Sequence, residues 1–145
     1  MFESCVEKQR QVKALFAQCR DEEQKYQQII SMGRALPHLP SAEKLPQNIV
    51  QGCQSTVYLS SKLVDGSMLF AAESDALISS GLAAVLIKVY SGESPEAVLK
   101  CPPDYLEELG IGASLTPGRA NGLYSIHLRM KQEALKLYIK HTMSS

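Results

Sequence analysis

Cysteine and histidine are the residue types in this sequence that could support nucleophilic or metal chemistry. The chain has cysteines at Cys5, Cys19, Cys53 and Cys101, and histidines at His38, His127 and His141. The cysteines are too widely spaced to form a CxxC pair, so the sequence lacks the local motif for structural zinc or dithiol redox chemistry. The spacing therefore predicts chemistry by a single thiol, or none.

Cys53 has the local surroundings that best suit a nucleophile. It is predicted to lie on a loop that enters a strand, after Gly52, which permits tight backbone geometry. The polar residues Gln54 and Ser55 follow it before the apolar strand begins. A cysteine on such a loop can be reactive, but free cysteine is also a common small packing residue. The local pattern leaves both interpretations open.

The elements that must position Cys53 begin with two N-terminal helices and a connector. Asp21 is predicted to be the N-cap of the second helix, because an acidic first turn follows it. That helix is expected to continue to Leu36-Pro37, and prolines then interrupt the chain as far as Pro46. An irregular connector over residues 37–46 is expected.

The one clear strand signal lies around Asp65-Gly66. Asp-Gly between apolar runs is typical of a two-residue hairpin turn, which requires positive φ. Such a turn pairs Val64 with Ser67 and sets the register of both strands. It also predicts one shared apolar face made of Val57, Leu59, Leu63, Met68 and Phe70.

Helical patterns fill the rest of the chain. Ser74-Asp75 is predicted to cap a long apolar helix that ends near Gly92. Ser94-Pro95 opens a short helix, and Thr116-Pro117 opens the C-terminal one. Helices around a small antiparallel sheet indicate an α+β fold, and a length of 145 residues favours a single domain over 1–145.

Composition excludes several classes of partner. Fifteen basic and fifteen acidic residues cancel, and no basic stretch resembles a phosphate-binding footprint, so no nucleic-acid partner is expected. No apolar run is long enough for a bilayer span, so no membrane partner is expected. The first residues, with Glu3 and Glu7, do not resemble a secretory or transit leader, which predicts a cytoplasmic location.

The segment around Cys53 resembles the active-site signature of the SufE family of sulfur acceptors. The matching positions are Asn48, Gly52, Cys53, Ser55, Val57 and the aromatic Tyr58, where relatives more often have Trp. The resemblance extends along most of the chain, through Glu23-x-Lys25-Tyr26 with Ile30 and Gly33, Ser74-Asp75-Ala76 with Gly81-Leu82, and Leu115-Thr116-Pro117 with Arg119 and Asn121-Gly122-Leu123.

The resemblance implies a fold shared with IscU-type scaffolds and a role in iron–sulfur cluster assembly. Cys53 would accept a sulfur atom as a persulfide from a cysteine desulfurase of the SufS kind, stimulate that enzyme, and pass the sulfur to a downstream cluster scaffold. The chain would be a carrier with no cofactor of its own and no metal, since pyridoxal phosphate belongs to the desulfurase.

The same resemblance suggests supporting residues for Cys53. Gly52 and Gln54 flank the thiol, and the position of Arg119 lies near the cysteine loop in the family. At the third helical position the helix dipole disfavours the positive charge of Arg119, so the helix itself does not explain an arginine there. A surface arginine paired with an acidic neighbour is an equal alternative to a role near the cysteine loop. Asp75 would contact the desulfurase or merely cap its helix. Cys19 matches a cysteine of some relatives, although packing explains it better.

The resting state of Cys53 can be predicted from strand parity. Cys53 shares the parity of the apolar face, so its thiol is expected to turn toward the core. No Lys or Arg lies between Lys44 and Lys62, so no local cation would lower the thiol pKa. The resemblance likewise implies a loop that must swing out to meet the donor.

Other functions fit parts of the pattern. A cysteine hydrolase or transferase would pair Cys53 with a histidine, although no familiar nucleophile motif surrounds the histidines. A cluster scaffold would bring several cysteines together. An adaptor of the same fold would use Cys53 for no chemistry at all.

Overall fold

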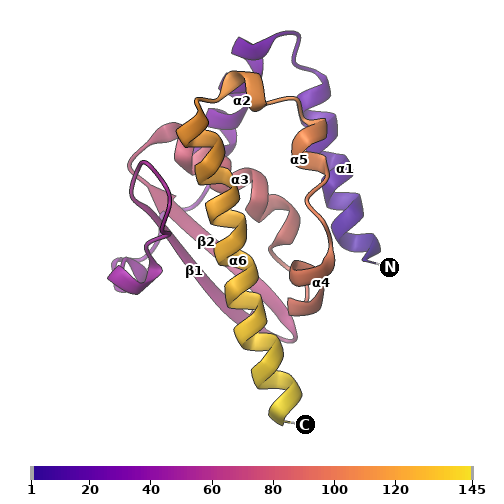
Figure 1. The fold of residues 1–145 in the computed structure, drawn as a ribbon, viewed down its shortest axis with the longest axis vertical. Helices are drawn as coiled ribbons and strands as arrows, with labels where there is room; N and C mark the ends of the chain where they lie inside the picture. The colour runs from indigo at the N-terminus through magenta and orange to yellow at the C-terminus, as the bar shows by residue number, and fades with distance from the viewer. Residues whose placement is uncertain (1, 145) are drawn as a thin grey trace.

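The computed structural model describes residues 2–144, and it places a two-stranded sheet among helices (Figure 1). The α-helices are α1 (Glu3–Ala17), α2 (Glu22–Arg34), α3 (Leu77–Tyr90), α4 (Pro95–Lys100), α5 (Tyr105–Glu108) and α6 (Pro117–Ser144). The strands are β1 (Val57–Val64) and β2 (Ser67–Ser74), and short 3-10 turns occur at Ser41–Glu43, Pro46–Asn48 and Gly112–Ser114. The α+β class with one small antiparallel sheet is confirmed.

Side-chain caps start three of the helices where the sequence predicts them. The Asp21 carboxylate accepts the Gln24 N–H at 2.8 Å, and the Ser94 hydroxyl accepts the Ala97 N–H at 3.1 Å. The Thr116 hydroxyl accepts the N–H of Arg119 at 3.4 Å. Each cap satisfies one of the free N–H groups of a first helical turn.

The predicted cap of α3 by Ser74-Asp75 is wrong. The N-cap residue is Ala76, and no side chain bonds to the first turn there. The Ser74 hydroxyl instead donates to the carbonyl of Thr56 at 2.7 Å and accepts the Ala76 N–H at 3.2 Å. Because β2 runs as far as Ser74, this hydroxyl joins the end of the hairpin to the chain that enters β1.

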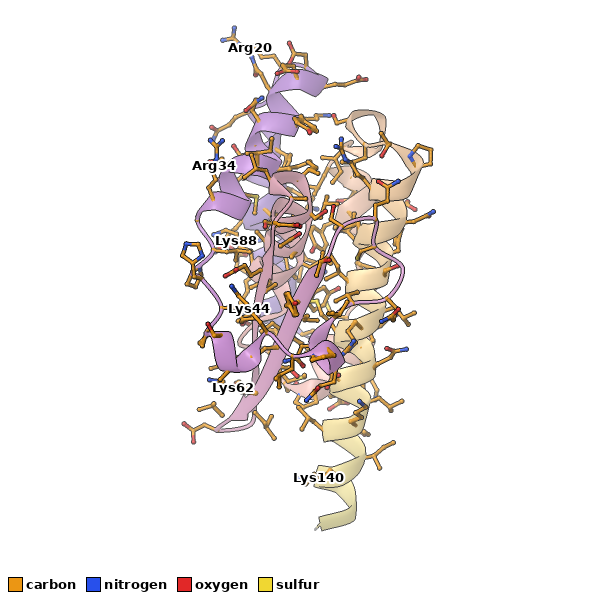
Figure 2. The ribbon with its side chains drawn as sticks, turned by 90° about the vertical axis from the view of Figure 1, so that its left-hand side faces the viewer. Arg20, Arg34, Lys44, Lys62, Lys88 and Lys140 are labelled. Carbon is orange, nitrogen blue, oxygen red and sulfur yellow. The ribbon has the colours of Figure 1, made fainter. Side chains whose placement is uncertain are left out.

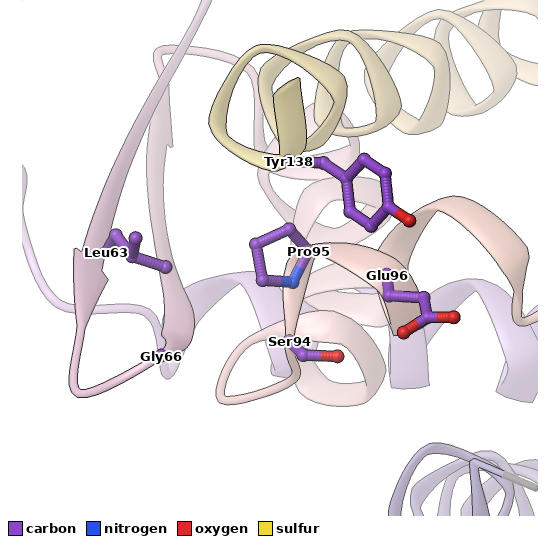
Figure 3. Close-up of a pocket in the computed structure, with 6 residues that line it drawn as sticks. All are labelled: Leu63, Gly66, Ser94, Pro95, Glu96 and Tyr138. Carbon is purple, nitrogen blue, oxygen red and sulfur yellow. The ribbon is translucent and has the colours of Figure 1, made fainter. Parts of the chain in front are cut away.

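The hairpin has the predicted register, from Val64 opposite Ser67 at the turn to Val57 opposite Ser74 at the open end. One expectation fails at the turn, where Leu63 is 41% exposed although it shares the parity of the buried face. Helices α4 and α6 reach this end of the sheet without covering the Leu63 side chain completely. Leu63 instead lines a shallow pocket of about 180 Å³ with Pro95 and Tyr138 (Figure 3).

Helix α3 is the centre of the packing. It contacts α1, α2, α6 and β2, and its residues from Gly81 to Leu86 are all buried (Figure 1). A Cβ atom on Gly33 of α2 would lie 2.5 Å from the backbone nitrogen of Gly81. The two helices therefore cross at a distance that only glycine at this contact permits.

The connector between α2 and the hairpin is held by Glu73 of β2. The Glu73 carboxylate accepts the Leu39 N–H at 2.8 Å and pairs with Lys44 at 2.5 Å. These partners, Lys44 foremost, lower the pKa of Glu73 to about 2. Figure 2 shows the connector, marked by Lys44, crossing outside the strands.

Helix α6 covers the core with Leu123, Ile126, Met130 and Ala134, as its periodicity predicts. No helix within residues 2–144 has the length and apolar character that crossing a bilayer requires. The same buried side carries His127, whose ring lies 5.2 Å from that of Tyr90. Its Nε2 atom has no hydrogen-bond partner among the described residues. Burial, together with the charge of Lys131, lowers the pKa of His127 to about 4.

We expect His127 to make the stability of the protein depend on pH in the acid range. A lowered folded-state pKa means that the fold favours the neutral ring, so this stability is present above pH 6.5 and is lost as the pH falls toward 4. Between pH 7 and pH 5 the loss should be roughly 2 kcal/mol in the free energy of unfolding.

Denaturant unfolding at several pH values checks this expectation. His127→Phe keeps an aromatic ring against Tyr90 and should lose most of the dependence between pH 7 and pH 5. His38→Gln is the matched control, because His38 is a surface residue. An unchanged pH dependence in His127→Phe would contradict this role for the buried ring.

Candidate functional site

Cys53 lies on a short loop whose ends are tied together. The Val50 N–H donates to the Val57 carbonyl at 2.9 Å, and Ile49 forms a bridge with Tyr58. The loop over residues 51–56 is therefore closed at its base by backbone hydrogen bonds, directly before β1 begins. The predicted position of Cys53, on a loop that enters a strand, is confirmed.

Gly52 has a backbone conformation that its residue type explains. Its φ is +92°, in the region that residues with a Cβ atom rarely adopt. A Cβ atom here would also lie 2.5 Å from the Oγ atom of Ser125 on α6. Glycine thus permits both the turn before the cysteine and the close approach to α6.

The Cys53 thiol is half-buried and packs against the core, in the direction that strand parity predicts. Its S–H donates to the Gly122 carbonyl of α6, with Sγ 3.8 Å from the oxygen. Burial raises the pKa of the thiol above its usual value, and no charged group contributes to this shift. The resting thiol is therefore protonated at neutral pH and is a poor nucleophile.

Helix α6 also holds the chain that leads into the loop. The Arg129 guanidinium donates to the carbonyl oxygens of Ile49, at 3.1 Å, and of Gln47. An ion pair with Glu133 at 3.0 Å fixes its orientation. Arg129 was not a candidate from the sequence, because no local motif shows that an arginine on α6 reaches carbonyls some 80 residues earlier.

Arg119 lies in the first turn of α6, and its guanidinium is 5.9 Å from the centre of the Tyr26 ring on α2. This is a cation–π contact between two elements. Arg119 makes no contribution to the shifted pKa of Cys53, whose one cause is burial. The structure thus brings Arg119 to Tyr26, while the cysteine loop contacts the same helix at other positions.

Asp75 is exposed at the open end of the hairpin. It follows Ser74, whose hydroxyl donates to the carbonyl of Thr56 at the end of the cysteine loop. The structure therefore places Asp75 at the same end of the sheet as Cys53. It does not show a direct contact between the two side chains.

The remaining cysteines have different surroundings. Cys5 and Cys101 are buried, and the Gln9 side chain donates to the Cys101 sulfur at 3.5 Å and to the Pro102 carbonyl at 2.9 Å. Cys19 lies in the turn between α1 and α2. Among the described residues, no three His, Cys, Asp or Glu side chains are grouped as a metal site would require.

Comparison with known proteins places this arrangement in a family. Residues 10–134 match the family described as "SufE: Fe-S metabolism associated domain". The chain is 37% identical over 120 residues to an uncharacterized SufE-like protein of Synechocystis sp., an alignment that covers 83% of this chain and 76% of that protein. It is 34% identical over 134 residues to the SufE-like protein 1, chloroplastic/mitochondrial, of Arabidopsis thaliana, covering 92% of this chain and 36% of the plant protein.

The fold has a counterpart among solved structures. The solution structure of a hypothetical protein from Thermus thermophilus superposes with a TM-score of 0.74 and 27% sequence identity, covering 89% of this chain and 94% of that one. The family match includes the Cys53 loop, the hairpin and most of α6. The chain therefore belongs to the SufE family, whose members are associated with iron–sulfur metabolism.

Proposed function

We propose that Cys53 accepts a sulfur atom from a cysteine desulfurase and carries it as a persulfide toward iron–sulfur cluster assembly. The observation that carries this proposal is the position of the thiol: it lies on a surface loop with a glycine turn, half-buried against α6. Membership of a family associated with iron–sulfur metabolism supports the same chemistry. The buried thiols of Cys5 and Cys101 lack such access.

The transfer is a thiol exchange at sulfur. The Cys53 thiolate attacks the terminal sulfur of the donor's cysteine persulfide, forms a new S–S bond and breaks the donor's S–S bond. The donor cysteine leaves as a thiolate and takes up a proton. Oxidation states balance, because the sulfane sulfur moves from one cysteine to the other without an external oxidant.

This reaction requires a thiolate, and the resting loop disfavours one. Burial raises the pKa of Cys53, and no described cation opposes that effect. Attack therefore follows exposure of the loop, or approach of a cation from the partner. Burial in the resting state would in turn shield a bound persulfide from other thiols.

The desulfurase would supply pyridoxal phosphate and the persulfide, and a cluster scaffold would receive the sulfur. Asp75 and Gln54 lie on the exposed side of this end of the molecule and are candidates for contact with the desulfurase. Arg119, held over Tyr26, is better suited to fix the start of α6 against α2.

A cysteine hydrolase is less well supported. Such an enzyme needs a base within hydrogen-bond reach of its nucleophile. The described partner of the Cys53 thiol is a backbone carbonyl, and the ring of His127 lies buried against Tyr90. His38 lies on the connector, where its ring interacts with Glu73 of β2.

We expect incubation with a desulfurase and cysteine to add the mass of one sulfur atom to the protein, reversibly by reductant. Cys53→Ser should abolish the addition, since the acceptor sulfur is removed. Whole-protein mass measurement checks this, with Cys19→Ser as the matched control. An addition that survives in Cys53→Ser and disappears in Cys19→Ser would move the acceptor site and refute the assignment.

We also expect this protein to raise the turnover of its partner desulfurase severalfold. An acceptor removes the persulfide that otherwise blocks the next cycle, so the gain appears in the steady-state rate of alanine formation from cysteine. The Cys53→Ser variant should bind the desulfurase but not raise its turnover. Stimulation of equal size by Cys53→Ser would favour the adaptor function, in which the thiol does no chemistry.

Gly52→Val should slow sulfur transfer more than it weakens binding to the desulfurase. Valine at a φ of +92° costs about 1–3 kcal/mol and collides with Ser125, so the loop loses its turn geometry. Gly66→Val is the matched control: its φ is +82°, but nothing lies within 4 Å of the added Cβ atom. Single-turnover transfer rates and binding titrations separate the effects, and equal losses of transfer in both variants would contradict a specific role for Gly52.

A further inference from the structure

The cysteine loop lies along one side of α6, residue against residue. Gly52 approaches Ser125, the Cys53 sulfur bonds to the carbonyl of Gly122, and the Gln54 side chain lies against Gly118. Consecutive loop residues thus follow helical positions that are one turn apart, in the direction opposite to the helix. The spacing of small residues at 118, 122 and 125 forms a shallow seat for the loop.

The contact at Gly118 is the tightest of the set. A Cβ atom on Gly118 would overlap the amide end of the Gln54 side chain, and it would lie 2.9 Å from the Gln54 Cγ. The neighbouring position is looser, since a Cβ atom on Gly122 would sit 3.8 Å from the Cys53 sulfur, an ordinary contact. The absence of a side chain at Gly118 therefore leaves the space that the Gln54 amide occupies.

We propose that Gln54, seated on Gly118, is the latch that holds the cysteine loop closed against α6. The inference rests on the proposed function, for which it names the device that controls exposure of the sulfur. Gln54 is a positioning residue: it takes no part in bond making, and it acts on Cys53 because the two are adjacent in a loop tied at its base.

The location of the latch explains how a partner would open it. Gln54 is exposed, whereas the adjacent Cys53 is half-buried. A protein that approaches the loop reaches the Gln54 amide before it reaches the sulfur. Withdrawing that amide from Gly118 leaves the thiol held by its weak S–H bond to the Gly122 carbonyl, so the loop can turn outward.

The test measures the alkylation rate of Cys53 in the full chain, without any desulfurase. Iodoacetamide is the probe, and the mass of the Cys53 peptide separates this thiol from the others. The variants are Gly118→Ala, which displaces the flexible Gln54 side chain, and Gln54→Ala, which removes it. Gly112→Ala is the matched control, because nothing lies within 4 Å of a Cβ atom there. Alkylation of Cys19 in the same sample is an internal reference.

Both latch variants should alkylate at Cys53 roughly tenfold faster than the wild type, because Gly118→Ala over-packs the closed state and Gln54→Ala removes the contact that holds it. The melting temperature of Gly118→Ala should not fall, since alanine suits the first turn of a helix better than glycine does, and that of Gln54→Ala should not fall because Gln54 is an exposed loop residue. The double variant should match Gln54→Ala alone, because a methyl group on residue 118 then has nothing to displace. The alkylation rate of Cys19 should stay at its wild-type value in every variant. The alkylation rate of Cys53 should stay at its wild-type value in Gly112→Ala.

Several results would overturn the latch. If Gly118→Ala folds and the alkylation rate of its Cys53 stays within about twofold of wild type, the contact between Gln54 and Gly118 has no role in closing the loop. Effects of the two substitutions that multiply in the double variant show that they act independently. If Gly118→Ala does not fold, Gln54→Ala alone decides, and a wild-type Cys53 rate in that variant counts against the latch. No sulfur transfer enters these measurements, so the proposed function stands or falls separately.

Discussion

The packing of α3 is the constraint on which the rest of the structure depends. A two-stranded sheet cannot bury a core by itself, so the hairpin needs an apolar helix against one face. That helix is α3, which also contacts α1, α2 and α6. Its close crossing with α2 requires glycine at Gly33 and Gly81, where any side chain would force the two backbones apart. The positions of the outer helices follow from this centre.

The position of α6 in turn determines the surroundings of the thiol. Helix α6 packs its apolar side on the core and presents small residues to the chain that enters β1. Arg129 binds the carbonyls before the loop, and the Gly122 carbonyl receives the thiol itself. A single helix therefore supports the core, anchors the approach to the loop and forms the seat on which the sulfur rests.

The proposed sulfur transfer would place two opposing requirements on the site. A thiol attacks as a thiolate, which favours exposure and nearby positive charge, whereas a persulfide survives better away from solvent. In the resting structure, burial dominates, and it raises the pKa of Cys53. Under the proposed function, a loop closed by small contacts, with a glycine turn at Gly52, would let the same residue meet both requirements at different times.

Local sequence was sufficient to predict the α+β class, the hairpin register, the caps at Asp21, Ser94 and Thr116, and the loop position of Cys53. Each depends on residues close together in the chain, through turn dihedrals, cap hydrogen bonds or periodicity. Long-range packing decided the exposure of Leu63, the uncapped start of α3 beside Asp75, the placement of Arg119 over Tyr26, and the seat of Gln54 on Gly118. These join residues far apart in sequence, and their contacts depend on where the helices end and which faces meet, which no local pattern encodes.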